Sequence, residues 1–190
     1  IDTGTRTGFA VWDNRKRTLI DVTSLPIHKA MERVKAYAEL ENMVIYDQLT
    51  GVYSMYSFME HCKQYDEYNG SVAVVVCDIN HLSDINIQYG QKAGNQALIN
   101  VAGVLKKILM DRAYIARINE GNFVAVMKNV TDAEAGKTFE QIKRTVEKEC
   151  NNGKFGVTIE YGIAMRKASN RWIMDIVHEA VNDMRDRKGR

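Results

Sequence analysis

From residue 46 onward, the apolar positions of the chain recur with two different periods, one typical of strands and one of helices. Residues 71–78 form an almost continuous apolar run, as a strand buried on both faces does. Residues 95–112 instead gather their apolar side chains on one helical stripe. By these criteria strands are predicted at 71–78, 114–118, 122–128 and 156–165, and helices at 54–66, 95–112, 131–149 and 171–187. Helices that separate strands indicate a layered α/β (α+β) domain.

Two further elements precede this domain. Residues 8–13 and 18–23 are β-rich runs on either side of a charged turn, which predicts a hairpin. Two strands alone are marginally stable in water, so residues 1–23 are interpreted as the remnant of a larger upstream domain. Asp21-Val22-Thr23 resembles the D-I-T that closes many PAS sensor domains.

The segment 24–45 is predicted to be a linker or signalling helix. Ser24 is a good N-cap, and Pro26 suits a first helical turn. Its apolar residues share one seam that Glu41 interrupts: Ile27, Met31, Val34, Ala38 and Ile45. A seam this short fits a helix packed on its own domain as well as a stalk that forms a homodimer and transmits a signal.

Composition narrows the class of protein. The 190 residues are 45% hydrophobic, enough for one domain and an appendage, and a net charge of +2 gives no reason to expect nucleic acid as a partner. No apolar run approaches the ~20 residues that cross a bilayer, so direct membrane insertion is not expected. The three cysteines lack metal-ligand spacing and leave one unpaired in any disulfide scheme, which indicates a reducing compartment such as the cytoplasm. Because residue 1 is Ile, we expect a piece of a longer protein, which could be the cytoplasmic part of a membrane-tethered sensor.

The stretch after the 71–78 strand is the richest in candidate chemistry. Asp78 ends the strand, and residues 79–95 are expected to form a loop with several polar side chains and two glycines. A carboxylate at the end of a buried strand faces the crevice where α/β sheets bind ligands, and loop amides there can hold phosphate. Taken alone, such an Asp is more often a solvated turn or a helix cap.

Four motifs in the right order resemble one family. Asp47 to Gly51 is similar to a D-x-L-T-G motif, and Asp78 to Asn95 is similar to the loop D-x-D-x-F-K-x-x-N-D-x-x-G-H-x-x-G-D. Gly162-Ile163-Ala164 and Gly189-Arg190 resemble a later G-x-A and the closing G-R-N. Residues 46–190 thereby resemble a GGDEF domain.

This resemblance implies a palm-like, nucleotide-cyclase fold: a mixed sheet of about five strands flanked by helices. The family joins two GTP molecules into cyclic di-GMP across a two-fold dimer, with a divalent metal such as Mg²⁺ on the triphosphate. It implies metal contacts from Asp78 and the backbone carbonyl of Ile79. It also implies nucleotide contacts, to the guanine base from Asn86 and Asn95, and to phosphate from three other positions: Leu82, Ser83 and Arg190.

The signature hairpin departs from the family pattern. Arg117 and Phe123 are six positions apart, as in R-x-G-G-D-E-F, which fixes the register. The replaced positions are Asn119 and Glu120 for the two glycines, Gly121 for the metal-binding acid, and Asn122 for the catalytic Glu. Neither Gly nor a neutral amide can bind a hard cation or accept a proton as a carboxylate does, so no catalytic residue is assigned.

The neighbouring positions weaken the site further. Alternation along a strand would usually aim Glu120 away from Asp78, although a tight turn relaxes that rule, and Gly121 is expected to have a positive φ. Asn95 stands where an Asp usually binds guanine, and Asp186 where a Lys usually binds phosphate, for which Arg187 or Lys188 could compensate. Residues 110–113 lack the R-x-x-D motif of the family's product-inhibition site.

Three functions remain open at this point. The leading hypothesis is a catalytically impaired GGDEF-like regulatory domain in cyclic di-GMP signalling, which binds GTP or another purine nucleotide without turnover and acts on a neighbouring sensor or effector domain. A residually active diguanylate cyclase or nucleotidyltransferase, with Asp78 and Glu120 as its acids, is the second. The third is a structural docking module with an empty cleft.

Overall fold

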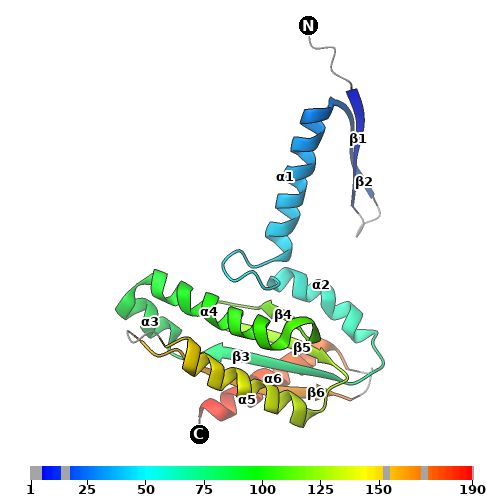
Figure 1. Cartoon of the computed structure of the whole chain (residues 1–190). Coiled ribbons are helices and arrows are strands. Elements are labelled where there is room, and N and C mark those ends of the chain that lie inside the picture. The colour runs from blue at the N-terminus through cyan, green and yellow to red at the C-terminus, as the bar shows by residue number, and fades with distance from the viewer. Residues whose placement is uncertain (1–5, 14–17, 152–154, 168–170, 190) are drawn as a thin grey trace. The chain divides into compact units, whose positions relative to one another are not determined.

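The computed structural model describes residues 6–13, 18–151, 155–167 and 171–189. The chain divides into two compact units, Ile1–Met43 and Val44–Arg190. Figure 1 labels the elements of both units.

The first unit is a hairpin followed by a helix. β1 (Arg6–Asp13) and β2 (Thr18–Pro26) pair antiparallel, with a register shift between Val11 and Trp12, and α1 (Ile27–Ile45) follows directly. The helix therefore begins at Ile27, and the prediction that Ser24 caps it is wrong. Ser24 instead pairs with Gly8 in the β ladder, and Pro26 ends the strand. The charged turn at 14–17 lies outside the described residues.

The apolar seam predicted on α1 is exposed. Ile27, Met31 and Val34 keep more than half of their surface open to solvent, and Ala38 is exposed as well. Ala30, which flanks this seam one turn before Val34, is the buried residue of α1. The seam is thus an uncovered apolar face in this single chain.

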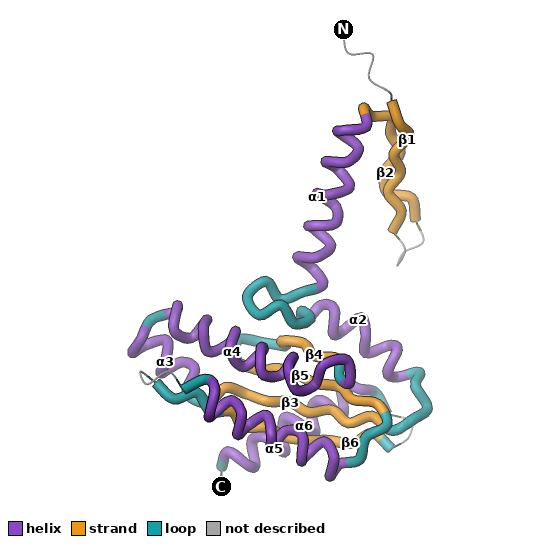
Figure 2. The backbone as a smooth tube through the Cα atoms, in the orientation of Figure 1, coloured by secondary structure: helices purple, strands orange, loops and turns teal. Residues whose placement is uncertain are grey.

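The second unit is a sheet with helices on both faces. Its strands are β3 (Val72–Ile79), β4 (Tyr114–Arg117), β5 (Asn122–Lys128) and β6 (Ile159–Arg166), paired in the order β4-β5-β3-β6. Its helices are α2 (Met55–Asp66), α3 (Leu82–Tyr89), α4 (Gln91–Leu109), α5 (Asp132–Glu149) and α6 (Ile173–Lys188), with a 3₁₀ turn at Met110–Arg112. The tube in Figure 2 shows this division into helix and sheet. The predicted α/β class is confirmed.

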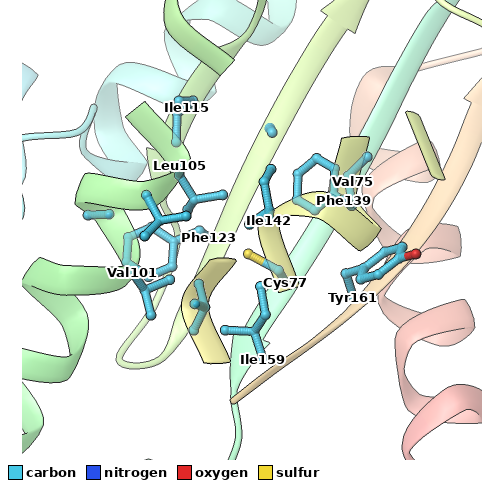
Figure 3. Close-up of a cluster of buried hydrophobic side chains, with 14 of the residues drawn as sticks. Val75, Cys77, Val101, Leu105, Ile115, Phe123, Phe139, Ile142, Ile159 and Tyr161 are labelled. Carbon is cyan, nitrogen blue, oxygen red and sulfur yellow. The ribbon is translucent and has the colours of Figure 1, made fainter. Parts of the chain in front are cut away.

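The central strand β3 separates two hydrophobic cores. Ala73, Val75 and Cys77 face α4 and α5, while Val72, Val74 and Val76 face α2 and α6. Figure 3 shows the first core, where Val75 and Cys77 lie among side chains from both of its helices. Burial on both faces explains why this strand reads as a continuous apolar run.

The sheet differs from the expected mixed sheet of about five strands. Four strands pair among the described residues, and every ladder between them is antiparallel. The parallel component is one isolated bridge between Tyr53 and Ala116, in which the Tyr53 amide donates to Ile115 O and the Arg117 amide donates to Tyr53 O. The segment between α1 and α2 therefore attaches to the β4 edge without forming a strand.

The stretch 79–95, expected to be a loop, contains α3 and the first turn of α4. His81 adopts a left-handed conformation with φ of 56°, which turns the chain from β3 straight into α3. Gly90, with φ of 84°, then separates α3 from α4. Among the described residues, no helix is both long and apolar enough to cross a membrane.

Candidate functional site

A cavity of about 440 Å³ opens at the C-terminal end of β3. It lies where this strand meets α3, α4 and the turn between β4 and β5. Its lining residues are Asp78, Ile79, His81, Leu82, Ser83, Asn86, Gln91, Leu98, Arg117, Glu120 and Gly121.

Most of the site residues predicted from the sequence meet in this cavity. Asp78, Ile79, Leu82, Ser83 and Asn86 from the β3–α3 stretch line it, together with Glu120 and Gly121 from the hairpin. Glu120 sits in the turn between β4 and β5, where the alternation of a strand does not apply.

The other predicted positions lie elsewhere. The side-chain oxygen of Asn95 accepts a hydrogen bond of 3.0 Å from Gln91, and Asn95 does not line the cavity. Phe123 is 1% exposed and belongs to the core between the sheet and α4 and α5. Arg190 lies outside the described residues.

The hairpin turn is closed by two side chains. Asn119 Oδ1 accepts hydrogen bonds from the amides of Gly121, at 3.2 Å, and Asn122, at 2.9 Å. Arg117 donates from Nε to Asn119 O at 3.1 Å and from Nη2 to Glu120 O at 2.7 Å. Gly121 does not adopt the positive φ that was expected, since Gly51 and Gly90 are the glycines with positive φ among the described residues. An Asx turn, rather than a left-handed glycine, makes the reversal.

Arg117 also ties the hairpin to the segment that follows α1. Its Nη1 lies 3.3 Å from Asp47 Oδ2, and the two side chains are 16% and 23% exposed. The amide and hydroxyl of Thr50 donate to Asp47 Oδ1 at 2.9 and 2.6 Å. Burial of Asp47 disfavours its charge, but the bonds from Thr50 and the charge of Arg117 outweigh burial and lower the pKa of the Asp47 carboxyl.

Asp78 faces position 121 of the hairpin on one side and a lysine on the other. A Cβ built on Gly121 would lie 3.0 Å from Asp78 Oδ1, so any side chain at 121 would meet this carboxylate. Lys188, from the last turn of α6, makes an ion pair with Asp78 Oδ2. Asn122 is the residue opposite Asp78 in the β3–β5 register.

Asn86 presents an amide oxygen that has no partner. Its Oδ1 is buried and accepts no hydrogen bond within the described part of the chain. A Cβ on Gly94 would lie 1.9 Å from this oxygen, so a glycine is needed at 94 for the amide to hold its place. A buried acceptor without a donor costs about 1–3 kcal/mol.

Comparison with known proteins decides the family. The family model "Diguanylate cyclase, GGDEF domain" matches residues 44–190, most of the chain. The chain belongs to the GGDEF family. The matched range coincides with the second compact unit.

Relatives of known sequence agree with this assignment. The chain is 31% identical over 128 residues to the uncharacterized protein YhcK of Bacillus subtilis, covering 63% of this chain and 36% of that protein. It is 24% identical over 143 residues to the diguanylate cyclase DgcS of Shewanella oneidensis, covering 73% of this chain and 47% of DgcS. The chain therefore spans less than half the length of these two curated relatives.

Solved GGDEF structures share the fold. The coiled coil and GGDEF domain of DgcB from Caulobacter crescentus, in complex with c-di-GMP, superposes with a TM-score of 0.75 at 21% identity, over 86% of this chain and 92% of that one. The GGDEF domain of FimX from Pseudomonas aeruginosa gives a TM-score of 0.67 at 20% identity, over 75% of this chain and 92% of that one.

The GGDEF cavity of this chain does not fit the divalent metal that the family implies. Asp78 is already paired with Lys188, Gly121 offers no ligand, and Asn122 is a neutral amide. Among the described residues, no group of three or more His, Cys, Asp and Glu side chains converges on a possible metal position. Glu120 lines the cavity from an exposed turn but does not complete such a group.

Sequence reasoning gave incomplete roles to several residues of this GGDEF site. Lys188 was named only as a substitute for the phosphate-binding lysine, and its pairing with Asp78 had no signal in the sequence. Gln91 lines the cavity because α4 begins four residues earlier than predicted, and Leu98, inside the predicted helix, lines it as well. The link from Arg117 to Asp47 joins two recognised motifs, and their co-occurrence was the signal that could have found it.

Proposed function

We propose that this GGDEF domain is a catalytically impaired regulatory module of cyclic di-GMP signalling. In this proposal it holds GTP or another purine nucleotide in the cytoplasm without turnover and acts on a neighbouring sensor or effector domain. The observation that carries the proposal is Gly121, which faces Asp78 at the position of the second acid. Without that acid the cavity lacks the paired carboxylates that would bind a metal and activate a ribose hydroxyl.

The cavity nevertheless keeps features suited to a base and a phosphate. The unpartnered Asn86 Oδ1 is an acceptor for a purine N–H group. The turn from His81 into α3 leaves the first amides of that helix without partners within the helix, as phosphate sites require. These features support binding, whereas Gly121 and Asn122 argue against turnover.

Calorimetry with GTP on the full chain tests binding, and chromatography of the same mixture tests turnover. We expect measurable heat, loss of binding in Asn86→Leu, and no cyclic di-GMP with Mg²⁺ or Mn²⁺. Asn95→Leu is the matched control, because Asn95 lies on α4 outside the cavity and should leave the affinity unchanged. Formation of cyclic di-GMP would refute the proposal. No heat with GTP, GDP or cyclic di-GMP would instead favour a docking module.

A second candidate function rests on Glu120. Because Glu120 lines the same cavity as Asp78, the two could serve as acids in a residual nucleotidyl transfer. That function predicts metal-dependent pyrophosphate release from GTP or ATP that both Asp78→Ala and Glu120→Gln abolish. Absence of pyrophosphate with either nucleotide would exclude it.

We further propose that the domain forms a homodimer through α1. The support is the exposed seam, on which Ile27 and Met31 are each 58% exposed and Val34 is 54% exposed. Sedimentation of Val34→Glu should show a weaker dimer than the native chain. Ala36→Glu adds the same charge to the other side of the helix and should have little effect. A native chain that is monomeric at all concentrations would contradict this part of the proposal.

A further inference from the structure

The Asp78 carboxylate has a cation supplied by the chain itself. Lys188 Nζ and Asp78 Oδ2 form an ion pair, and the two side chains are 33% and 25% exposed. Partial burial makes the attraction stronger than that of a fully solvated pair. The pair joins the C-terminal end of α6 to the C-terminal end of β3, beside the cavity.

The fold holds α6 in the position that delivers this lysine. A Cβ on Gly162 of β6 would lie 2.1 Å from Ala180 O and 2.2 Å from Met184 N, so the helix backbone rests directly on the strand. Asp183 Oδ2 accepts the amide of Ile163 at 2.8 Å. Because β6 pairs with β3, these contacts fix the last turn of α6 next to the strand that carries Asp78.

The same turn is fastened a second time by an arginine. Arg187 lies 3.0 Å from Asp183, and its guanidinium stands 5.0 Å above the Tyr161 ring. Two successive basic residues therefore have separate roles, Arg187 against β6 and Lys188 against Asp78. Lys188 is thus placed by packed backbone and neighbouring contacts, and not only by its own flexible chain.

Lys188 supplies the positive charge that pairs with Asp78. Oδ2 is paired with the ammonium, and Oδ1 faces Gly121, where a second carboxylate would have stood. A divalent ion requires oxygen ligands and, as a rule, more than one carboxylate. The pair of the Asp78 carboxylate and the Lys188 ammonium is already neutral.

We propose that Lys188 takes the place of the divalent cation at Asp78. The cavity then has no metal site of its own, and a phosphorylated ligand binds there without Mg²⁺. The statement about the ligand rests on the proposed function, whereas the statement about the metal does not.

Binding of Mn²⁺ to the full chain, followed by electron paramagnetic resonance without nucleotide, tests the metal statement. The native chain should show no Mn²⁺ binding that depends on Asp78, so Asp78→Asn should leave its Mn²⁺ binding unchanged. Gly121→Asp combined with Lys188→Met restores the second acid and removes the competing ammonium. This double variant should bind Mn²⁺ at least about tenfold more tightly than native, and adding Asp78→Asn should abolish the gain.

The matched control combines Gly121→Asp with Arg185→Met, which removes one positive charge from the same turn of α6 without freeing Asp78. It should gain clearly less affinity than the double variant. Circular dichroism checks that each variant folds. If Gly121→Asp does not fold, Lys188→Met alone replaces the double variant in the Mn²⁺ measurement. Asp78-dependent Mn²⁺ binding by the native chain, or equal gains in control and test variants, would overturn the proposal.

Nucleotide titrations separate this proposal from the proposed function. If GTP binds, its affinity should be the same in Mg²⁺ and in EDTA. Binding that requires Mg²⁺ and is unaffected by Lys188→Met would refute the role of Lys188. If no nucleotide binds, the proposed function fails while the Mn²⁺ measurement still decides the role of the lysine.

Discussion

Two ion pairs flank the cavity, and they differ in the residues that they join. Arg117–Asp47 joins two residues that the family pattern contains, and it holds the hairpin turn through two backbone carbonyls as well. Lys188–Asp78 instead brings a residue from outside that pattern onto the acid at the end of β3. The difference shows that the hairpin and the acid of the cavity are held separately, because each ion pair joins a different pair of elements.

The largest expected effect comes from Gly162→Ala, which displaces α6 and with it the Lys188 that pairs with Asp78. The added methyl group would overlap the backbone of α6, which cannot rotate away, and we expect a loss of about 3 kcal/mol in the free energy of unfolding. Urea denaturation measures it. Gly103→Ala in α4, where nothing lies within 4 Å of the new Cβ, should instead stabilise by roughly 0.5–1 kcal/mol. Similar losses in both variants would disprove the close contact.

Arg117→Met should have the next largest effect and break only the pair that holds the hairpin. It leaves the partly buried Asp47 without its counter-ion and two turn carbonyls without their donor, so we expect a loss of about 2 kcal/mol. The same denaturation assay applies. Arg112→Met removes an exposed bond to Ile108 O and should change stability by less than roughly 0.5 kcal/mol. Equal effects would mean that Arg117 has no special role in the hairpin.

Asp47 should make this pair sensitive to acid. Since the pKa of Asp47 is lower in the folded than in the unfolded chain, its contribution is present above the unfolded pKa of about 3.9 and is lost as pH falls through the folded value. Asp47→Asn should cost about 1–2 kcal/mol near neutral pH, and the difference from native should shrink below about pH 4. Denaturation at a series of pH values measures this. A difference independent of pH would argue against the ionised form.

Lys188→Met should have the smallest effect on stability. Both partners are partly open to water, so we expect a loss of no more than about 1 kcal/mol, weaker in high salt. Thermal unfolding at low and high ionic strength measures it. A loss larger than that of Arg117→Met would reverse the comparison and make the Lys188 pair a principal support of the fold.

Much of the fold of the second unit followed from apolar periodicity. The buried run at 71–78 and the hairpin at 114–128 are confirmed as β3, β4 and β5, because their patterns reflect burial on both faces of one sheet. α3 was missed since its eight residues alternate polar and apolar side chains and only Ile85 is buried. The prediction that Ser24 caps α1 failed because the pairing of β2 with β1 outweighed the preference of Ser24 for a helix cap.

The site was predictable as a list of residues but not as a set of contacts. Motif order placed Asp78, Asn86 and Gly121 near one another, and one cavity contains all three. The unpartnered oxygen of Asn86 depends on how closely Gly94 packs against it, which sequence does not encode in any local pattern. The partner of Asp78 lies 110 positions away, so only the packing of α6 reveals it.

The pairing of β3 with β6 also has a consequence for how the domain folds. β3 receives its first neighbour from β5, but its other edge stays open until β6 arrives, with Val72 joining Arg166 far along the chain. Closing so long a loop is slow and entropically costly, so we expect this to be a late step in folding. During synthesis, the apolar β3 is therefore the segment most exposed to mispairing with another chain, and pairing with β6 ends that exposure.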